Sequence, residues 1–193
     1  MSDVLVWRLE PAQLVIASAP VGGGIGMRDW ILNAQVPKDY SRVDLSAHVA
    51  ELAAVQGCRG NGVGMLTAAN LEKVSLASEA GVEVHATVGI TAPTWAAAEG
   101  ASEAAYTPGT INIVAFLPVR LTDAALVNAV MTVTEAKTQA LLDAGIPGTG
   151  TASDAVCIVS PPDGEPAPFG GPRSEVGAPL ARAVYTAVRS RLP

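Results

Sequence analysis

One segment, residues 110–160, restricts the fold more than any other part of the chain. Residues 111–117 form a short, largely apolar run stopped by proline, as expected of a buried strand. Thr122 is a suitable N-cap, and a helical pattern continues from it to Ala144, where glycine and proline follow. Residues 156–159 are again a short β-rich run. The segment therefore predicts a strand, a helix and a second strand.

The predicted helix carries its polar groups in one line. Asn128, Thr132, Glu135 and Gln139 are spaced by four, three and four residues, which places them on one face. Most other side chains of the helix are apolar, as in buried helices. Amides, a hydroxyl and a single carboxylate suit the lining of a semi-enclosed pocket better than open water. The alternative is a solvated stripe in which Glu135 is an ordinary surface acid.

Composition limits the class of protein. The 193 residues are 49% hydrophobic with a net charge of −6, and they fit a single domain spanning 1–193. No apolar run approaches the roughly 18 residues of a membrane span, and the N-terminus lacks the pattern of a signal peptide. We therefore expect a soluble, cytoplasmic protein without a membrane partner. The absence of a basic run argues against nucleic acid, and the oligomeric state, including a homo-oligomer, stays open.

Two hairpins are predicted outside the central segment. Residues 4–9 and 13–19 are β-like runs divided by a Glu-Pro pair. Residues 72–77 and 82–90 alternate apolar and polar side chains, with a helix over 71–80 as the alternative. Because hairpins accompany the central unit, we expect a mixed β-sheet with helices packed on it, an α/β or α+β fold.

Two further helices and a strand are expected. Residues 46–55 have the spacing of a short amphipathic helix, and residues 63–67 that of a short strand. Residues 161–172 are rich in proline and glycine and predict an exposed loop. Residues 174–191 then predict a closing amphipathic helix.

The glycine-rich segment 22–26 does not match a phosphate-binding loop. Its spacing gives neither GxGxxG nor GxxxxGK[ST], so the glycines more simply permit a close backbone path near a ligand or another strand. Arg28 and Asp29 follow among apolar residues, where a structural salt bridge explains them at least as well as catalysis.

Common metal and nucleophile motifs are missing. The two histidines, His48 and His85, belong to no HExxH motif, and there are no cysteine pairs, so the sequence supports no metal site. Cys58 and Cys157 are isolated in apolar settings, as reduced thiols are, although a disulfide is not excluded. There is no GxSxG motif. These patterns do not indicate any cofactor with certainty.

The polar segment 148–154, GTGTASD, allows two interpretations. It can be a helix-to-strand turn whose hydroxyls and aspartate satisfy backbone amides. It can equally be a loop that binds carbonyl or amide groups of a ligand. If the two central strands are parallel, this loop lies at the amino end of the second strand, away from the usual site of open α/β sheets.

Several motifs together resemble one enzyme family. They are, in order, RDWILNAQVP, VGMLTAA, PGTINIV, NAVMTVTEAKTQAL, GTGTASDAVCIVSP and the closing FGGPRSEVGAPLARAV. This series, over about residues 22–188, resembles the adenosylcobinamide amidohydrolase (CbiZ) family. The resemblance implies hydrolysis of the amide that joins the aminopropanol arm to the corrin ring. The product would be adenosylcobyric acid, returned to adenosylcobalamin synthesis, with the corrinoid as substrate rather than cofactor. Residues 89–95 depart from the family's TAGxSN pattern because the asparagine is missing.

Amide hydrolysis requires a base, an oxyanion stabiliser and a proton for the leaving amine. Glu135 is the expected base, because partial burial on the polar line would raise its pKa. Asn112 is expected to donate to the oxyanion, and Asp154 to orient water or pair with the leaving ammonium. Lys137 lies on another face of the helix from Glu135 and can pair with a carboxylate. The residues expected to bind the substrate are Asn33, Thr67, Asn128, Thr138, Thr149, Thr151 and Ser153.

Other mechanisms and functions stay open at this stage. Thr149, Thr151 or Ser153 could act as a nucleophile, although no adjacent base is visible. A non-catalytic corrinoid-binding protein could use the same pocket. The altered segment 89–95 would also permit a C–N hydrolase that acts on another amide.

Overall fold

The computed structural model describes residues 3–99 and 109–193, and within these ranges it contains one mixed sheet of seven strands. The strand order is β3-β2-β1-β7-β6-β5-β4. The strands are β1 (Val4–Ala17), β2 (Gly24–Gln35), β3 (Gly62–Thr67), β4 (Ser75–Glu79), β5 (Val82–Val88), β6 (Ile111–Phe116) and β7 (Ala155–Ser160). The helices are α1 (Leu45–Val55), the short 3-10 helix η1 (Leu71–Lys73), α2 (Asp123–Asp143) and α3 (Gly177–Arg189). The predicted mixed sheet with packed helices is confirmed.

The central strand–helix–strand unit is confirmed. Strands β6 and β7 pair in parallel, with α2 as the connection between them. Thr122 is the N-cap, and its side-chain oxygen accepts a hydrogen bond from Ala125 N at 3.1 Å. Ala144 forms the C-cap before Gly145, whose φ is +72°. Local sequence signals alone therefore placed both ends of this helix.

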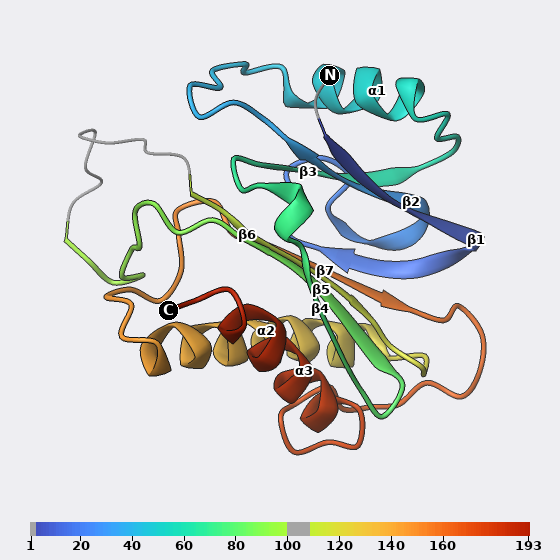
Figure 1. Ribbon diagram of the computed structural model, residues 1–193. Coiled ribbons are helices and arrows are strands. Elements are labelled where there is room, and N and C mark those ends of the chain that lie inside the picture. The colour runs from blue at the N-terminus through green and yellow to red at the C-terminus, as the bar shows by residue number, and fades with distance from the viewer. Residues whose placement is uncertain (1–2, 100–108) are drawn as a thin grey trace.

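The sheet folds back on itself, so that its two halves face each other (Figure 1). Strand β2 does not neighbour β5 or β6 in the sheet, yet Asn33 on β2 is hydrogen-bonded to Thr87 on β5 and Asn112 on β6. The apolar part of the interior likewise combines Ile31 of β2 with Val114 of β6. The two half-sheets, β1–β3 and β4–β7, thus enclose one interior layer.

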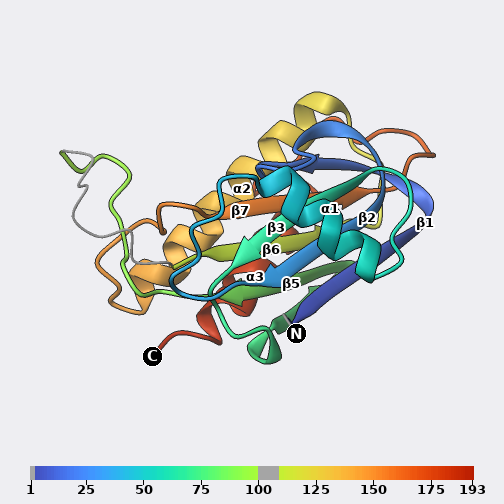
Figure 2. The ribbon, with the colours of Figure 1, turned by 90° about the horizontal axis from the view of Figure 1, so that it is seen from above.

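Helices cover the two outer faces. Helix α1 lies over β2 and β3, where Val49 and Ala53 pack against Trp30 and Leu32 (Figure 2). Helices α2 and α3 cover the other half-sheet, on the opposite side of the molecule (Figure 1). The side chains of β6 alternate accordingly: Ile111, Ile113 and Ala115 face α2 and α3, whereas Asn112 and Val114 face the interior. The layers are therefore helix, half-sheet, half-sheet and helices.

The first predicted hairpin is wrong. Residues 4–17 form one strand, β1, which continues through a cis Glu10–Pro11 peptide bond, and its antiparallel partner is the glycine-rich β2. The register shifts between Arg8 and Gln13, so Pro11 lies in a bulge where no ladder donor is required. Glycines of the 22–26 segment do meet another strand closely, since a Cβ on Gly22 would clash with the carbonyl of Gly62 on β3.

The remaining elements follow the predictions closely. Strands β4 and β5 form the second hairpin, and only Leu71–Lys73 of the alternative helix is helical, as a 3-10 turn.

Arg28 and Asp29 do not pair with each other: Arg28 donates to the carbonyl of Gly22, and Asp29 accepts from Asn61 N. Both cysteines are free. In the described ranges, no helix is long and apolar enough to cross a membrane.

Candidate functional site

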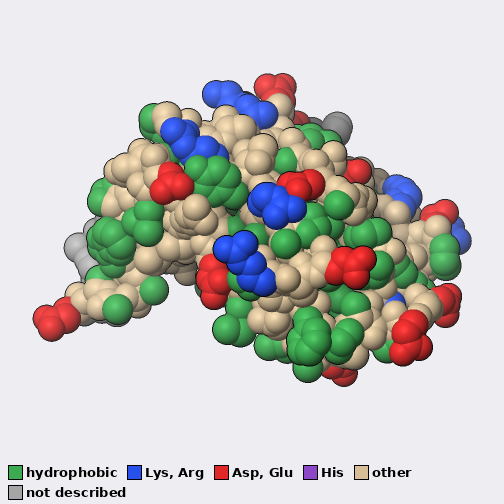
Figure 3. Space-filling model, turned by 90° about the horizontal axis from the view of Figure 1, so that it is seen from below, with side chains coloured by type: hydrophobic (Ala, Val, Ile, Leu, Met, Phe, Trp, Pro, Cys, Tyr) green, Lys and Arg blue, Asp and Glu red, His purple; other side chains and the backbone are tan. Residues whose placement is uncertain are grey.

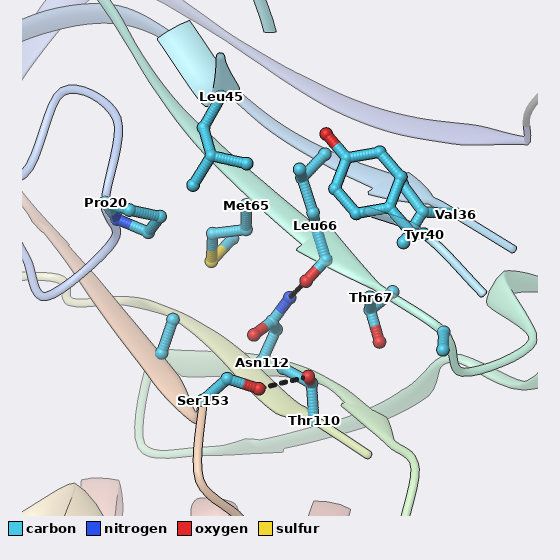
Figure 4. Close-up of a pocket in the computed structure, with 12 residues that line it drawn as sticks. Pro20, Val36, Tyr40, Leu45, Met65, Leu66, Thr67, Thr110, Asn112 and Ser153 are labelled. Atoms are coloured by element: carbon cyan, nitrogen blue, oxygen red, sulfur yellow. Dashed lines mark hydrogen bonds between the residues drawn. The ribbon is translucent and has the colours of Figure 1, made fainter. Parts of the chain in front are cut away.

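A pocket of about 130 Å³ opens at one end of the interior, between the two half-sheets (Figure 4). The carboxyl ends of β2 and β3 meet the amino ends of β6 and β7 at this edge. Pro20, Val36, Leu45 and Met65 supply apolar walls. The last residues of the 148–154 loop lie at the amino end of β7, which is not the usual site of an open α/β sheet. They still border this pocket, because folding of the sheet brings the carboxyl ends of β2 and β3 beside them.

The floor of the pocket is a buried hydrogen-bond network. Asn112 Nδ2 donates to Asn33 Oδ1 at 2.9 Å and to the Leu66 carbonyl at 3.2 Å. Asn33 Nδ2 donates in turn to Thr87 Oγ1 at 3.1 Å. The three side chains come from residues that are at most 2% exposed, and they join both half-sheets. Most buried amide groups in proteins are hydrogen-bonded, and here the network holds the side chains of the floor in fixed positions.

Three hydroxyl groups border the same floor. Thr110 Oγ1 and Ser153 Oγ lie 2.7 Å apart, and Ser153 Oγ also donates to the Gly109 carbonyl at 3.3 Å. Figure 4 shows this pair below Asn112, with Thr67 on the neighbouring wall. Thr67 Oγ1 accepts a hydrogen bond from Ala69 N at 3.0 Å, and its own proton has no acceptor among the described residues. Because Ser153 donates to Gly109, the Thr110 proton is donated to Ser153 Oγ, and the Thr67 proton is the one of these three that is available to a ligand carbonyl or to water.

Asp154 anchors the loop that carries Ser153. Its Oδ2 lies 2.5 Å from Lys137 Nζ on α2, with side chains 9% and 12% exposed. Its Oδ1 accepts from Ile111 N at 2.9 Å and from Thr151 Oγ1 at 2.5 Å. The expected pairing of Lys137 with a carboxylate is confirmed. Because both Asp154 oxygens are occupied, this carboxylate holds α2, β6 and the 148–154 loop together.

Two further predicted residues also hold the loop. Thr138 on α2 donates to the Thr149 carbonyl at 3.0 Å. Thr149 Oγ1 accepts from Ala96 N at 3.0 Å and lies 3.3 Å from the Thr94 carbonyl. Thr138 and Thr149 are not among the residues that line the pocket. Each interpretation of segment 148–154 therefore holds in part: most of the segment is a hydrogen-bonded turn, and Ser153 is its one residue that lines the pocket.

A charged cluster at the start of α1 supports the pocket wall. Tyr40 lines the pocket, and its hydroxyl lies 2.7 Å from His48 Nδ1. Arg42 Nη2 lies 2.5 Å from Asp44 Oδ2, and Arg42 Nη1 lies 2.8 Å from Glu51 Oε2. Hydrogen bonds from Arg42 lower the pKa of Asp44 to about 2, and they also lower the pKa of Glu51. These contacts tie the loop that carries Tyr40 to the helix.

The structure places Glu135 away from this pocket. Its side chain is exposed in an open groove between α2 and α3, with Arg182 and Tyr185 among the residues opposite. Figure 3 views this face, on which acidic, basic and apolar side chains are mixed. The predicted partial burial of Glu135 is wrong, because the polar line of α2 faces the α3 side. Asn128 lies on the same side, where a Cβ on Gly171 would approach its Oδ1.

Thr132 is the buried exception on that line. Its hydroxyl lies 2.9 Å from the Gly170 carbonyl and 3.2 Å from the Asn128 carbonyl, so it holds the C-terminal segment against α2. Gln139 is exposed, like Glu135. The solvated alternative therefore describes the carboxylate and the amide of Gln139 better than the semi-enclosed pocket. Within residues 3–99 and 109–193, no group of three His, Cys, Asp or Glu side chains is arranged to hold a metal.

Comparison with known proteins identifies the family. A family model described as adenosylcobinamide amidohydrolase matches residues 1–192. The chain belongs to this family. An adenosylcobinamide amidohydrolase of Methanosarcina mazei is 30% identical over 184 residues, which cover 91% of this chain and 88% of the relative. One of Halobacterium salinarum is 35% identical over 180 residues, covering 88% of this chain and 76% of the relative.

Of the predicted site residues, the pocket brings together Thr67, Asn112 and Ser153 as lining residues, with Asn33 directly behind them. The sequence interpretation missed Thr87 and Tyr40, which belong to distant elements and carry no local motif. Thr110 was visible inside the PGTINIV motif of this amidohydrolase family, directly before a buried strand. Its position at the start of that strand was the signal that could have marked it.

Proposed function

We propose that this chain hydrolyses the amide joining the aminopropanol arm to the corrin ring of adenosylcobinamide, and that it does so in the pocket above Asn112. The family supports the reaction. One structural observation supports the location: an otherwise apolar pocket ends on a buried floor of amides and hydroxyls, formed by Asn33, Thr67, Asn112 and Ser153. Such a floor offers both donors and acceptors to a single amide group.

The size of the pocket determines which part of the substrate enters. A volume of about 130 Å³ suits a short side arm, whereas the corrin macrocycle is far larger. The arm therefore enters with its amide, and the ring stays at the mouth. Apolar side chains of Pro20, Leu45 and Val36 line the pocket walls, where burial of the ring edge would be favourable.

The hydroxyl groups serve the acyl side of the reaction. Attack on an amide carbonyl builds negative charge on its oxygen, which preorganised donors stabilise. Thr67 has a hydroxyl proton to donate, and the Thr110–Ser153 pair can hold the attacking water beside the carbonyl. We place Asp154 and Lys137 behind this pair as positioning residues, since their contacts fix the loop that carries Ser153.

Proton transfer needs a titratable group near the pocket. Among the described lining residues, Tyr40 has the one titratable side chain, and its hydroxyl is 2.7 Å from His48 Nδ1. We propose that this pair takes the proton that the attacking water loses and delivers a proton to the leaving amine. A nucleophilic Ser153 receives less support, because its hydroxyl contacts Thr110 and a carbonyl rather than a base.

The test is incubation of the purified chain with adenosylcobinamide, without and then with an added divalent cation, followed by chromatography and mass analysis. Formation of adenosylcobyric acid and aminopropanol supports the proposal. Binding without cleavage would replace it with a corrinoid-binding function. Neither binding nor cleavage would point to a different amide. The Ser153→Ala variant, made in parallel, should bind the substrate and release product far more slowly.

A further inference from the structure

The orientation of the Asn112 side chain is fixed by its neighbours. Its Nδ2 lies 2.9 Å from Asn33 Oδ1 and 3.2 Å from the Leu66 carbonyl. A backbone carbonyl can only accept, so the nitrogen must face Leu66, and the opposite orientation would bring two oxygens together. Both Nδ2 hydrogens are then committed. The oxyanion-donor role that the sequence suggested for Asn112 is therefore unavailable to it.

The Asn112 Oδ1 atom has no such partner. It is buried and makes no hydrogen bond among the described residues. Leaving a buried carbonyl oxygen unpaired costs about 1–3 kcal/mol, and native proteins rarely do so without reason. In Figure 4 this oxygen points away from the Leu66 carbonyl, toward the part of the pocket between Met65 and Ser153. One unmet acceptor therefore lies just under the surface of the pocket floor.

The two other buried polar atoms without a partner in the described ranges are unrelated to this pocket. Trp30 Nε1 belongs to a side chain packed under α1, and Arg120 Nε lies in the loop after β6. Neither Trp30 nor Arg120 lines the pocket that Asn112 lines. The unmet acceptor is thus specific to the site and is held there by a network that spans both half-sheets.

We propose that Asn112 Oδ1 accepts the N–H of the substrate's scissile amide, so that this site selects N–H-bearing amides over esters and N-alkylated amides. The proposal rests on the proposed function, because it assigns a binding role within the same pocket. An ester places an oxygen lone pair against Asn112 Oδ1, and an N-methyl amide places a methyl group there. Both leave the buried acceptor unpaired in the complex.

We place Met65 as the side chain that moves when an amide reaches this covered oxygen. Its side chain lines the pocket and in Figure 4 points into the space above Asn112 and Ser153. Methionine has three rotatable bonds and adapts its shape at low cost. Displacement of this side chain by the arm would expose Oδ1 to the entering N–H and bury apolar surface of the arm in its place.

The experiment compares dissociation constants for three matched ligands: adenosylcobinamide, its ester analogue with oxygen in place of N–H, and its N-methyl amide. We measure them by calorimetric titration of the Ser153→Ala chain, which retains Asn112. The expected result is binding about tenfold weaker, or more, for each analogue than for the parent amide. Equal binding of all three ligands would overturn the proposal.

Two variants add a control for the network itself. Asn112→Ala should remove the discrimination, so that amide and ester bind equally. Thr87→Val disturbs the same network through Asn33 but leaves Asn112 Oδ1 in place, and it should keep the preference for the amide. A preference that survives Asn112→Ala would also overturn the proposal. The ligand series in the Asn112-containing chain decides the matter even if Asn112→Ala does not fold.

The two proposals fail in distinguishable ways. Absence of adenosylcobyric acid from the wild-type reaction would reject the proposed reaction, while the binding series would still report whether Asn112 reads an N–H. Cleavage of the parent amide combined with equal binding of the ester would reject the assignment to Asn112 alone.

Discussion

The Lys137 ammonium lies 2.5 Å from the Asp154 carboxylate, and the two side chains are 9% and 12% exposed. The same carboxylate accepts a hydrogen bond from Ile111 N at the start of β6. One buried ion pair therefore links α2 to both β6 and β7, the parallel strands that this helix joins in sequence. It also fixes the loop whose next-to-last residue, Ser153, borders the pocket.

Replacement of Asp154 by alanine should lower the free energy of unfolding by about 3–5 kcal/mol, because it leaves Lys137 buried without a counter-charge. Urea denaturation followed by circular dichroism measures the change. The double variant Lys137→Met/Asp154→Ala should recover part of the loss, since it removes the unpaired charge. An Asp154→Ala chain with wild-type stability but no turnover would instead restore the catalytic role that the sequence suggested.

Thr87→Val should destabilise the chain by about 1–3 kcal/mol, because the buried Asn33 Nδ2 loses its acceptor. The effect is measured as a shift in the midpoint of urea denaturation. Thr134→Val is a matched control: Thr134 is exposed on α2, and among the described residues its hydroxyl bonds only the Val130 carbonyl of its own helix. The control should change stability by less than about 0.5 kcal/mol. Equal effects of the two substitutions would mean that the Asn33 network contributes nothing.

Glu135→Gln should leave kcat/KM for adenosylcobinamide within about twofold of wild type, because an exposed carboxylate in the α2–α3 groove cannot contact a substrate in the pocket. Ser153→Ala should lower kcat by about 100-fold, because the Thr110–Ser153 pair could then no longer hold the attacking water, and misplacement of a reacting group costs rates of this order. Both values come from initial rates of product formation. Loss of turnover in Glu135→Gln alone would move the reaction to the other face of the molecule.

The sequence located local elements well because their signals are local. The cap at Thr122 and the stop after Ala144 define α2 whatever packs against it. Pro11 misled the interpretation in the opposite way, since a proline in a bulge of β1 carries the same local signal as a proline between two strands. Nothing near residue 11 indicates that β2 and β7 lie on either side of the strand.

The site could be predicted only in part, because folding of the sheet assembles it. Asn33, Thr87 and Asn112 come within hydrogen-bond distance through contact of two half-sheets, which no periodicity records. The polar line on α2 was the more visible feature, but a helix face does not reveal whether water or a second helix lies beside it. Here α3 lies beside the polar line, but the groove between the two helices is open and Glu135 stays exposed in it.

The two cysteines should differ sharply toward thiol reagents. Burial raises the pKa of the Cys157 thiol to about 12, whereas Cys58 is half-buried. Because the thiolate is the reactive form, the native chain at pH 8 should react rapidly with one equivalent of a chromogenic disulfide. The second equivalent should react only in denaturant. Cys58→Ser should abolish the rapid phase, and a rapid phase that persists in this variant would contradict the assignment.

The Arg42 cluster should make stability depend on pH in the acid range. Hydrogen bonds from Arg42 hold the pKa of Asp44 at about 2, below its ordinary 3.8, and lower that of Glu51 from 4.5. A carboxyl whose pKa is lower in the folded chain stabilises that state above the unfolded pKa, and this contribution disappears as pH falls through the folded pKa. The difference in urea midpoint between wild type and Arg42→Gln should therefore be present at pH 7 and vanish near pH 2. The groups are exposed, so the difference should be small and should shrink in 1 M salt. Arg42→Gln should also raise KM, because the loop that Arg42 holds carries Tyr40 into the pocket wall. A midpoint difference that grows on acidification would contradict this account of the cluster.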